Sequence, residues 1–588
     1  MAKKKEKETL KKEKKKTVSK ADTKIKEKKQ SKSDKLKVIP LGGVDGIGMN
    51  MTLLEHGDDI IAIDCGVAFP EDDMPGVDLV IPDFTYLLRN AEKVRGLVLT
   101  HGHEDHIGAV PYLLKQMNIP VYGTRLTLGI LRLKLAEHGI KKPDLREVFP
   151  GDTVQTGDAF NVEFIKVNHS IPDAVALCIT TPVGRVIHTG DFKFDLTPAV
   201  GDGRIDLYRL ATLGHKGIKL LMADSTNAER EGCTPSERKV GHSFDRIFYG
   251  CEKRIVVATF SSNVHRIQQI INASVKCGRK VAVTGRSMLN VVKAATELGY
   301  MRVPEGTIID PAEMKLYKDN QLTLITTGSQ GERMSGLYRM ANGEHSLINL
   351  GRNDMVVLSA SAIPGNEKLI GNIINGLYKL GAEVMTVDTD ETVHVSGHAC
   401  REELKMMQAL TNPEFFIPLH GEYKHLCAHA ALAKEMGINS KNIIIPENGR
   451  IIEVGKRGMA LGGTVTAEQI LVDGYGVGDI GSSVLKDRLQ LAEDGIIVVS
   501  ATVDFVIQEM TSGPEVITRG FVYVKENEQL LEELTDKAAE LIRKFVYNGK
   551  PDIFVLRERV KTALSSYIYS KTKKKPILLT VITENEIY

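Results

Sequence analysis

Residues 101–106 read His-Gly-His-Glu-Asp-His, so three imidazoles and two carboxylates lie on one short segment. The segment follows the apolar run 96–100, which is typical of a buried strand, and we therefore place it in a loop at a strand end. Without a cation these side chains would repel and desolvate one another. Imidazole and carboxylate are ligands that suit zinc where no thiolates are offered. The chain must fold so that this loop surrounds a metal ion.

Further candidate ligands also stand at the ends of apolar runs. His169 follows the run 162–168, Asp191 follows 185–190, and His420 follows 415–419. A single histidine at such a position could equally be a core or capping residue. Together with the loop 101–106, they predict strands whose ends converge on one rim of a sandwich.

The composition excludes several classes of protein. The seven cysteines are scattered and never spaced as Cys-x-x-Cys, which argues against a disulfide framework and a thiolate zinc ribbon. No apolar stretch reaches the length of a membrane span, and the lysine-rich start has no apolar segment of a secretory signal. We therefore expect a cytoplasmic protein without a membrane partner.

The net charge of +2 hides an uneven distribution. Residues 1–35 contain 16 Lys and 6 acidic residues, a net charge of +10, which leaves −8 for residues 36–588. Residues 1–35 contain too little apolar surface to offset the entropy of ordering, so they predict a disordered basic arm.

The remaining chain changes pattern twice. The first part contains short strand-like runs at 38–41, 51–54, 60–63 and 96–100. The second part alternates strands with helices. Its predicted strands are 254–259, 280–284, 322–326 and 355–359, and its predicted helices are 263–277, 288–299 and 367–381. Such alternation indicates βαβ units and a mainly parallel sheet. A strand at 495–500 and an amphipathic helix at 528–546 indicate a third unit. The glycines at 42–48 lack the following helix of a dinucleotide site, so we interpret them as tight turns.

Several motifs resemble a known family. Thr-His-x-His-x-Asp-His at 100–106, with the later His169 and Gly190-Asp191-Phe192, resembles the metallo-β-lactamase superfamily. Asp224, the loop 394–398 and His420 resemble motifs of the β-CASP nucleases, and the match narrows to the bacterial ribonuclease J family through Gly328-Ser-Gln-Gly-Glu332 and the segment 519–523. One departure is the acidic residue at 42–48, which is shifted by one position to Asp45.

The resemblance implies an α/β fold and a domain order. The fold is a metallo-β-lactamase αββα sandwich with an inserted β-CASP α/β domain and a small C-terminal α+β domain. The expected boundaries are arm 1–35, sandwich 36–240 and 391–475, β-CASP domain 241–390, linker 476–494 and C-terminal domain 495–588.

The resemblance also implies the site residues. One zinc ion would be held by His101, His103 and His169, the other by Asp105, His106 and His420, with Asp191 bridging them. Asp105 would orient the attacking water, and His398 would donate a proton to the leaving oxygen while Asp224 holds its ring. A 5′-phosphate would be bound by Ser261, Ser262, Asn263, His394, Val395, Ser396, Gly397 and His398, although the first three could simply cap a helix. A structural calcium ion would use Asp473 with main-chain oxygens near Pro75 and Val77.

The implied activity is a ribonuclease with two zinc ions per subunit. It would combine 5′→3′ exonuclease activity, preferring 5′-monophosphate RNA, with endonuclease activity in mRNA decay and rRNA maturation. Implied partners are single-stranded RNA, a second copy in homodimers or homotetramers, and other RNA-decay proteins or the ribosome. The basic arm would tether RNA.

Three alternatives remain open from the sequence. A thioesterase, glyoxalase-type enzyme or lactamase can share the sandwich, but such enzymes lack the insert 240–390 and the loop 394–398. A DNA-directed nuclease would differ through contacts with the 2′-hydroxyl that the sequence does not place. An inactive scaffold for RNA decay would have been free to lose any of the seven ligand positions.

Overall fold

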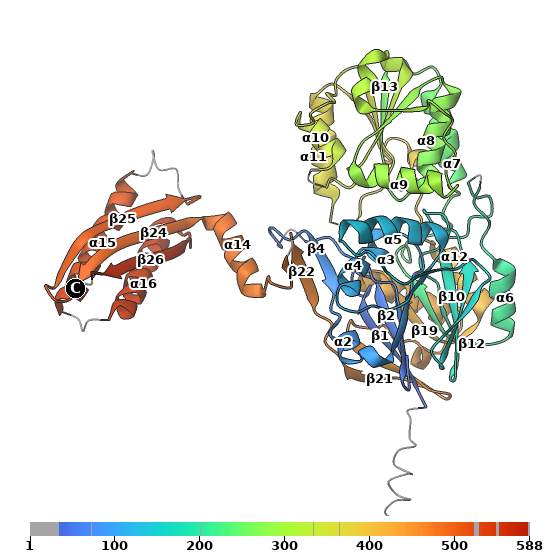
Figure 1. Cartoon of the computed structure of the whole chain (residues 1–588), viewed down its shortest axis with the longest axis horizontal. Coiled ribbons are helices and arrows are strands. Elements are labelled where there is room, and N and C mark those ends of the chain that lie inside the picture. The colour runs from blue at the N-terminus through green and yellow to red at the C-terminus, as the bar shows by residue number, and fades with distance from the viewer. Residues whose placement is uncertain are drawn as a thin grey trace, which may run out of the picture. The chain divides into compact units, whose positions relative to one another are not determined.

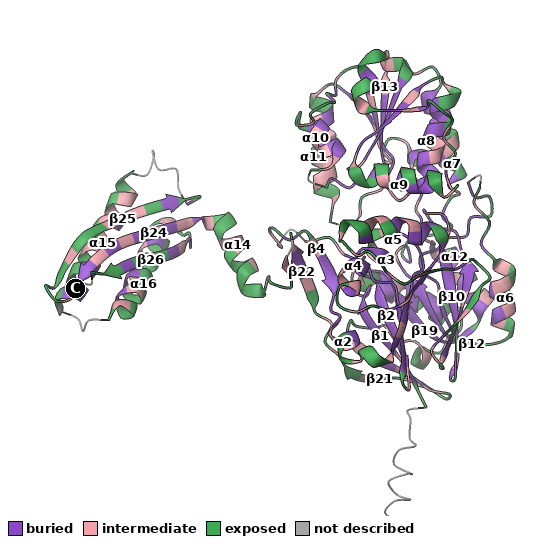
Figure 2. Cartoon of the chain, viewed as in Figure 1, coloured by how far each residue is buried: buried purple, intermediate pink, exposed green. Residues whose placement is uncertain are grey.

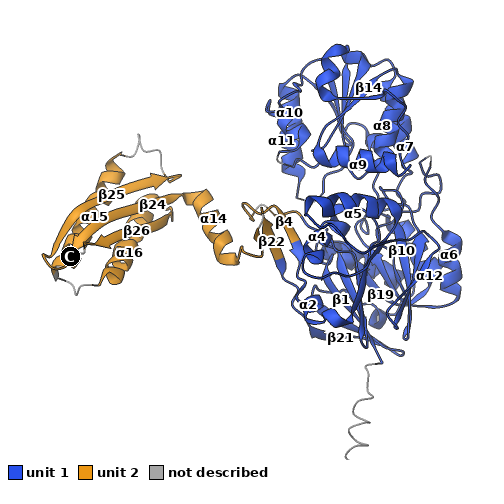
Figure 3. Cartoon of the chain, viewed as in Figure 1, with its two compact units in different colours: residues 1–68, 81–469 blue, residues 69–80, 470–588 orange. Residues whose placement is uncertain are grey.

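The computed structural model describes residues 34–71, 73–199, 201–332, 334–363, 365–474, 476–521, 528–548 and 552–585 (Figure 1). The expected basic arm lies outside the described residues, apart from residues 34 and 35. The chain divides into two compact units (Figure 3): one comprises residues 1–68 and 81–469, and the other comprises 69–80 and 470–588.

The first layer of the larger unit is an eight-stranded sheet ordered β21-β20-β1-β2-β3-β5-β6-β7. It is antiparallel from β21 to β3 and parallel from β3 to β7. The strands predicted at 38–41, 51–54, 60–63 and 96–100 correspond to β1, β2, β3 and β5. The strands are β1 (Leu36–Gly42), β2 (Met51–His56), β3 (Asp59–Ile63), β5 (Val94–Val98), β6 (Val121–Gly123), β7 (Leu145–Glu147), β20 (Arg450–Val454) and β21 (Met459–Thr464). The helices between them are α2 (Thr85–Arg89), η1 (Ala91–Lys93), α3 (Glu104–Ile107), α4 (Val110–Leu114) and α5 (Arg125–Glu137).

The second layer is a six-stranded sheet ordered β19-β12-β11-β10-β9-β8. Its strands are β8 (Thr153–Thr156), β9 (Phe160–Lys166), β10 (Val175–Thr181), β11 (Gly184–His188), β12 (Ile218–Asp224) and β19 (Pro413–Leu419). The accompanying helices are α6 (Leu207–His215), α12 (Arg401–Thr411), α13 (Tyr423–Glu435) and η5 (Ser440–Asn442).

Alternation along the strands explains why the two sheets stack. On β10, Val175, Leu177 and Ile179 belong to the core shared with the first sheet, whereas Ala176 and Cys178 belong to a second core that includes residues of α6, α12 and α13. Successive side chains of a strand point to opposite faces, so a strand buried on both faces is apolar throughout. The strands are correspondingly buried (Figure 2), and the predicted αββα sandwich is confirmed.

The inserted domain is a six-stranded sheet ordered β15-β14-β16-β13-β17-β18, in which every pairing is parallel. Figure 1 shows α7 and α8 on one side of this sheet and α10 and α11 on the other, so the predicted βαβ architecture is confirmed. The strands are β13 (Arg254–Ala258), β14 (Lys280–Val283), β15 (Ile308–Ile309), β16 (Leu322–Thr326), β17 (Asp354–Leu358) and β18 (Glu383–Met385). The helices are α7 (Arg238–Phe248), α8 (Val264–Lys276), α9 (Arg286–Glu297), α10 (Gly336–Ala341), α11 (Glu367–Lys379), η2 (Pro311–Leu316), η3 (Asp319–Gln321) and η4 (Glu391–Val393).

The smaller unit contains two three-stranded sheets, ordered β23-β22-β4 and β25-β24-β26. The segment 476–494, expected as a linker, contains the helix α14. The predicted amphipathic helix is α15, which buries Leu534, Ala538 and Ile542. The elements are β4 (Leu79–Pro82), β22 (Gln469–Asp473), β23 (Gly476–Val477), α14 (Ser482–Asp494), β24 (Ile496–Asp504), β25 (Glu509–Arg519), α15 (Glu528–Asn548), α16 (Ile553–Thr572) and β26 (Ile577–Glu584). Among the described helices of both units, none combines the length and apolar character needed to cross a bilayer.

The topology brings the predicted ligand positions to one rim. Strand β12 runs parallel to β11 and β19, with His188 opposite Met222 and Asp224 opposite Leu419. The segments that follow these three strands therefore leave the sheet at the same edge. The loop after β5 joins them from the other sheet, because the amide of Val175 donates to the carbonyl of Thr100 (3.0 Å).

We expect Phe164→Ala to destabilise the sandwich strongly. Phe164 lies on β9 between the two sheets and is 1% exposed. Its removal should lower the free energy of unfolding by about 3–5 kcal/mol, measured by urea denaturation. Phe149, which is 54% exposed, is the matched control. Phe149→Ala should change the free energy of unfolding by less than about 0.5 kcal/mol. Equal losses for the two variants would contradict this assignment of the core.

Candidate metal centre

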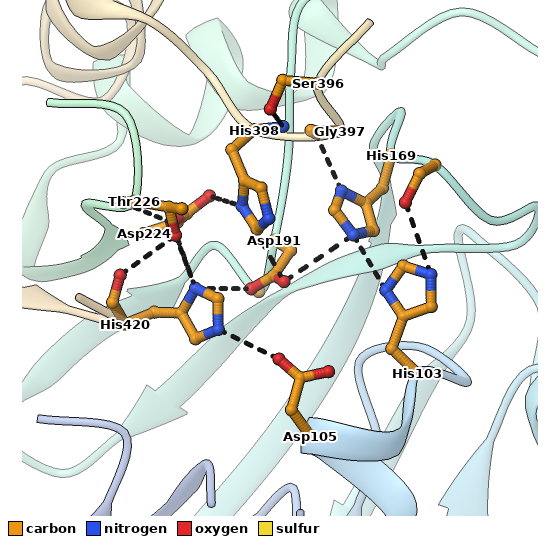
Figure 4. Close-up of polar contacts among 12 residues, drawn as sticks. His103, Asp105, His169, Asp191, Asp224, Thr226, Ser396, Gly397, His398 and His420 are labelled. Atoms are coloured by element: carbon orange, nitrogen blue, oxygen red, sulfur yellow. Dashed lines mark hydrogen bonds and ion pairs between the residues drawn. The ribbon is translucent and has the colours of Figure 1, made fainter. Parts of the chain in front are cut away.

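Four side chains form the first ligand cluster at the rim. His103 Nδ1 lies 3.0 Å from His169 Nε2 (Figure 4) and 3.1 Å from His101 Nε2. Asp191 Oδ2 lies 3.7 Å from the Nε2 atoms of His101 and His169. Four donor atoms therefore converge on one small volume, within 4.8 Å of one another.

A second cluster shares Asp191. His106 Nε2 lies 3.3 Å from Asp191 Oδ2 and 3.5 Å from Asp105 Oδ2, and His420 Nε2 lies 3.2 Å from Asp105 Oδ2. His420 Nδ1 is 3.5 Å from Asp191 Oδ1. The structure thus brings together all seven predicted ligands in two sets of four donors, with the Asp191 carboxylate common to both.

Hydrogen bonds fix which ring nitrogens carry lone pairs. The carbonyl of Gly397 can only accept a hydrogen bond, so His169 Nδ1–H donates to it at 2.8 Å. The Nε2 atom of the neutral ring therefore carries no proton and presents its lone pair. His106 Nδ1–H likewise donates to the carboxylate of Asp64 at 2.8 Å. The Thr100 hydroxyl contacts His101 Nδ1 at 3.0 Å, and the Thr226 hydroxyl contacts His420 Nδ1 at 2.8 Å. In metal sites, hydrogen bonds to the ring nitrogen that does not bind the metal orient the ligand histidines in this way.

The protonation of the first cluster suits a metal. Burial lowers the pKa values of His101 and His169 well below their ordinary range and that of His103 to about 4. Neutral imidazole is the form that binds a metal ion. The three facing nitrogens of His101, His103 and His169 cannot all be paired by N–H donors of these rings, so lone pairs are left directed at the shared volume, as a metal site requires.

The second cluster has the opposite charge balance. Burial acts against charge on His106 and His420, but carboxylates led by Asp191 outweigh it, which raises the pKa of His106 well above its ordinary range and that of His420 to about 10. Burial would also raise the pKa of Asp191, yet the adjacent His106 and His420 hold it well below the usual range. Carboxylates that favour a proton on these rings also favour a metal cation in its place. The donor set of both clusters therefore fits a metal centre.

Backbone geometry holds the short ligand helix α3 in place. Asp105 and His106 lie on α3, whose carbonyls accept from the amides of Asn50 (3.0 Å) and Cys65 (2.8 Å). A Cβ on Gly66 would lie 1.6 Å from the carbonyl oxygen of Asp105, so only glycine allows this approach. His420 adopts a left-handed conformation (φ 54°), which is uncommon for a residue with a Cβ and is typical of functional sites.

His398 lies beside the two clusters. Its Nδ1 is 2.8 Å from Asp224 Oδ2 and 3.9 Å from Asp191 Oδ2. Burial opposes charge on this ring, but Asp224 outweighs it and raises the pKa of His398. The predicted pairing of His398 with Asp224 is present, and the Nε2 atom of His398 has no protein partner among the described residues. His398 could also complete a third donor set with Asp191, Asp224 and His420.

The predicted phosphate-binding residues lie on two segments. Asn263 is the N-cap of α8, and its side chain accepts from the amide of Arg266 at 3.1 Å, which is the capping role considered from the sequence. The hydroxyls of Ser261 and Ser262 have no protein partner in the described part of the chain and are partly exposed. The loop 394–398 follows η4 and contacts the metal clusters through Gly397 and His398.

Buried cations hold the loop 394–398 by its carbonyls. Arg266, which is fully buried, donates to Glu237 with two nitrogens (3.0 and 2.8 Å), to the carbonyls of Ser359 and Val395, and to His394 Nδ1 (2.6 Å). These contacts use all five N–H groups of the guanidinium. The buried Lys193 donates to the carbonyl of Ser396 at 3.2 Å.

The loop 394–398 therefore presents hydrogen-bond donors that have no acceptor among the described residues. Because Arg266 occupies Nδ1 of the neutral His394, the Nε2 of that ring must carry its proton. The amides of Val395, Ser396 and Gly397 have no acceptor among the described residues. A Cβ on Gly397 would lie 2.6 Å from His169, so the glycine permits the close approach.

Several of these residues were not predicted from the sequence. Asp64 follows an apolar run, as the predicted ligands do, and that signal could have identified it. Thr226 stands two residues after Asp224, which the resemblance had singled out. Arg266, Glu237 and Lys193 gave no signal, because their roles depend on contacts between segments 29 to 203 positions apart.

The calcium expectation does not fit the structure. In the smaller unit, the guanidinium of Arg488 donates to Asp473 Oδ2 (2.6 Å) and to the carbonyl of Pro75 (3.1 Å). A cationic side chain thus occupies the oxygens expected to bind calcium. Val77 makes a local turn in which its amide donates to the carbonyl of Met74.

A two-sheet αββα sandwich with His and Asp clusters at its rim, interrupted by a parallel α/β domain, defines a metal-dependent hydrolase of the metallo-β-lactamase fold with a β-CASP insertion. Family profiles agree along the chain. Four profiles match segments of this chain. They are described as "Metallo-beta-lactamase superfamily" (residues 45–230), "Ribonuclease J, beta-CASP domain" (252–377), "Zn-dependent metallo-hydrolase RNA specificity domain" (387–446) and "Ribonuclease J C-terminal domain" (483–585). The chain belongs to the ribonuclease J family.

Curated relatives cover nearly the whole chain. Ribonuclease J 1 of Streptococcus pyogenes is 43% identical, covering 94% of this chain and 98% of the relative. Ribonuclease J2 of Bacillus subtilis is 40% identical (95% and 100%), and ribonuclease J of Thermus thermophilus is 42% identical (94% and 96%). A solved protein of unknown function from Enterococcus faecalis V583 shares the fold, with 18% identity and a TM-score of 0.50 over 71% of this chain and all of that one.

We expect Asp64→Asn to weaken metal binding. The amide cannot accept as strongly from His106 Nδ1–H, and such outer partners typically contribute 10- to 100-fold to metal affinity. Chelator competition with metal quantification should show a loss of about that size. Asp83→Asn is the control, because among the described residues that buried carboxylate accepts only from the amide of Thr85 and contacts no ligand histidine. Unchanged metal affinity in Asp64→Asn would show that Asp64 does not orient His106.

Proposed function

We propose that this protein is a ribonuclease that uses two zinc ions held by the paired clusters. The observation that carries the proposal is the Asp191 carboxylate, whose Oδ2 lies 3.3–3.9 Å from nitrogens of four histidines and belongs to both donor sets. Membership of the ribonuclease J family supports RNA as the substrate. Nitrogen and oxygen donors in sets of four, without thiolates, suit zinc.

Two metal ions held here would supply Lewis-acid activation of water and stabilise charge on the phosphodiester during in-line attack. The protein side chains supply the remaining functions. Asp105 is partly exposed and has a second carboxylate oxygen with which to accept a proton from the attacking water. His398 can donate a proton to the leaving 3′-oxygen, because Asp224 holds its Nδ1–H and directs Nε2 away. Asp224 acts as the orienter of His398.

We further propose that the loop 394–398 binds a terminal 5′-phosphate, together with Ser261 and Ser262. Among the described residues, the amides of Val395, Ser396 and Gly397 and the hydroxyls of Ser261 and Ser262 have no protein partner, so they offer neutral donors suited to an anion. The loop touches the ligand His169 through Gly397. A 5′-phosphate bound there would favour stepwise 5′→3′ digestion of monophosphorylated RNA, beside endonuclease activity. Oligomerisation remains a prediction from the sequence.

The substrate and end preference can be tested together. We expect 5′-monophosphate RNA to release mononucleotides at least tenfold faster than the 5′-triphosphate form, only with zinc present, when products are resolved on a sequencing gel. DNA of the same sequence is the control for the sugar. Equal, entirely internal cutting of both RNAs would contradict the exonuclease proposal, and absence of RNA cleavage with zinc bound would contradict the ribonuclease proposal.

If His398 is the general acid, its removal should lower the turnover rate without lowering the zinc content. His398→Ala should lower kcat by about 10²- to 10⁴-fold, the usual contribution of a general acid, at unchanged zinc content. His138→Ala, at a partly exposed position beside Lys115, should leave both quantities unchanged. If His398→Ala instead loses zinc, His398 is a ligand in the third donor set.

A further inference from the structure

The exposed side of α16 carries a groove in the smaller unit. The groove has a volume of about 550 Å³ and is lined by Phe554, Val555, Glu558, Arg559, Thr562, Ala563 and Ser566. Spacings of three and four residues place Val555, Arg559, Thr562, Ser566, Tyr569 and Lys573 on one stripe, which we call the α16 face. At 1.5 Å per residue this stripe is about 27 Å long. The opposite side buries Leu556, Val560, Leu564 and Ile568 in the core.

The helix α16 and the turn after it are strongly basic as a whole, and the α16 face itself carries Arg559 and Lys573. Residues 553–575 contain seven Lys or Arg and one Glu, whereas α15 (528–548) contains three basic and five acidic residues. Some of these cations are engaged: Lys571 pairs with Glu533 (2.9 Å), and Lys574 donates to the carbonyl of Phe521 (3.0 Å). The side-chain cations of Arg559, Lys561, Lys573 and Lys575 have no carboxylate partner among the described residues. Those four charges are available for a ligand.

Tyr569 is the centre of this basic region. Its side chain is 45% exposed, and the ammonium groups of Lys573 and Lys575 lie 5.4 and 5.2 Å from its ring centroid. The backbone fixes this arrangement: Lys573 ends α16 in a left-handed conformation (φ 60°), and the amide of Lys575 donates to Asp494 (2.7 Å). The two ammonium groups that lie over this exposed ring have no carboxylate partner among the described residues, so they offer two phosphate contacts beside an aromatic side chain.

We propose that the α16 face, with Tyr569, Lys573 and Lys575, binds single-stranded RNA as a second contact outside the catalytic centre. The proposal rests on the ribonuclease activity proposed above, which makes RNA the polyanion that meets this unit. Basic grooves with exposed aromatic side chains bind single strands by phosphate contact and base stacking, without requiring a sequence. An acidic protein would use the same charges, and the measurements below separate that outcome from RNA binding.

Kinetics on full-length, zinc-loaded enzyme test the proposal. The variants are Lys573→Gln/Lys575→Gln and Tyr569→Leu. The control is Lys486→Gln/Lys544→Gln, which removes two exposed lysines of α14 and α15 in the same unit that have no carboxylate partner in the described part of the chain. Substrates are 5′-monophosphorylated RNAs of about 6 and about 40 nucleotides. The residues concerned lie outside the catalytic machinery, so kcat should stay unchanged.

We expect the Lys573/Lys575 and Tyr569 variants to raise KM for the long RNA about three- to tenfold at low salt, with the short RNA unaffected. Losing two phosphate contacts should reduce the slope of log(kcat/KM) against log salt by about 1.4, since each contact contributes about 0.7 for single strands. Equal KM values for these variants and the control would overturn the proposal. A changed sedimentation mass at unchanged KM would also overturn it, in favour of a protein interface.

Crosslinking gives a readout that does not need turnover. A cleavage-resistant phosphorothioate RNA containing 4-thiouridine should crosslink to the peptide 566–575, identified by mass spectrometry, and less so in Tyr569→Leu. Crosslinks confined to other regions would overturn the proposal. Crosslinks at 566–575 in an enzyme that never cleaves RNA would support this surface while contradicting the proposed function.

Discussion

The structure depends on one electrostatic constraint, which is the concentration of imidazole and carboxylate groups around the buried Asp191. The carboxylates around the second cluster raise the pKa values of His106 and His420, whereas burial lowers the pKa values of the three histidines of the first cluster. A buried group of this kind is stable only when cations complete it. The fold meets the constraint by ending strands from both sheets at one rim.

A second set of contacts makes this rim rigid. Asp64, Thr100, Gly397 and Thr226 each engage the second nitrogen of a ligand histidine, so ring orientation is set before a metal binds. Arg266 extends the same principle into the inserted domain. Its guanidinium joins α8 to the loop 394–398, so the segment proposed to bind phosphate and the metal-site residues are positioned by one continuous network. The proposed order of chemistry, a bound 5′ end beside a metal centre, follows from that connection.

The sequence predicted the parts of the molecule that depend on local pattern. Apolar runs located β1, β2, β3 and β5, and the alternation after residue 240 predicted the parallel sheet of the inserted domain. The cluster 101–106 and the residues His169, Asp191 and His420 at strand ends were candidate ligands from their pattern, and the resemblance implied their division into two sets. The structure brings them together because the segments that carry them follow strands that share an edge. The helix α14 was missed, since its glycine-rich approach at 474–481 suggested a linker. Arg266 and Lys193 could not be predicted, because a buried cation is defined by distant partners. The calcium expectation did not anticipate Arg488, which binds both Asp473 and Pro75.

The central claim is that two metal ions occupy the two donor sets and share Asp191. Anomalous X-ray diffraction at the zinc edge, on crystals of the protein grown with zinc, tests it most directly. The account predicts two anomalous peaks, roughly 3.5–4 Å apart, one contacting His101, His103 and His169 and the other contacting Asp105, His106 and His420. A single peak, or a peak bound by His398 and Asp224 in place of Asp105 and His106, would contradict it.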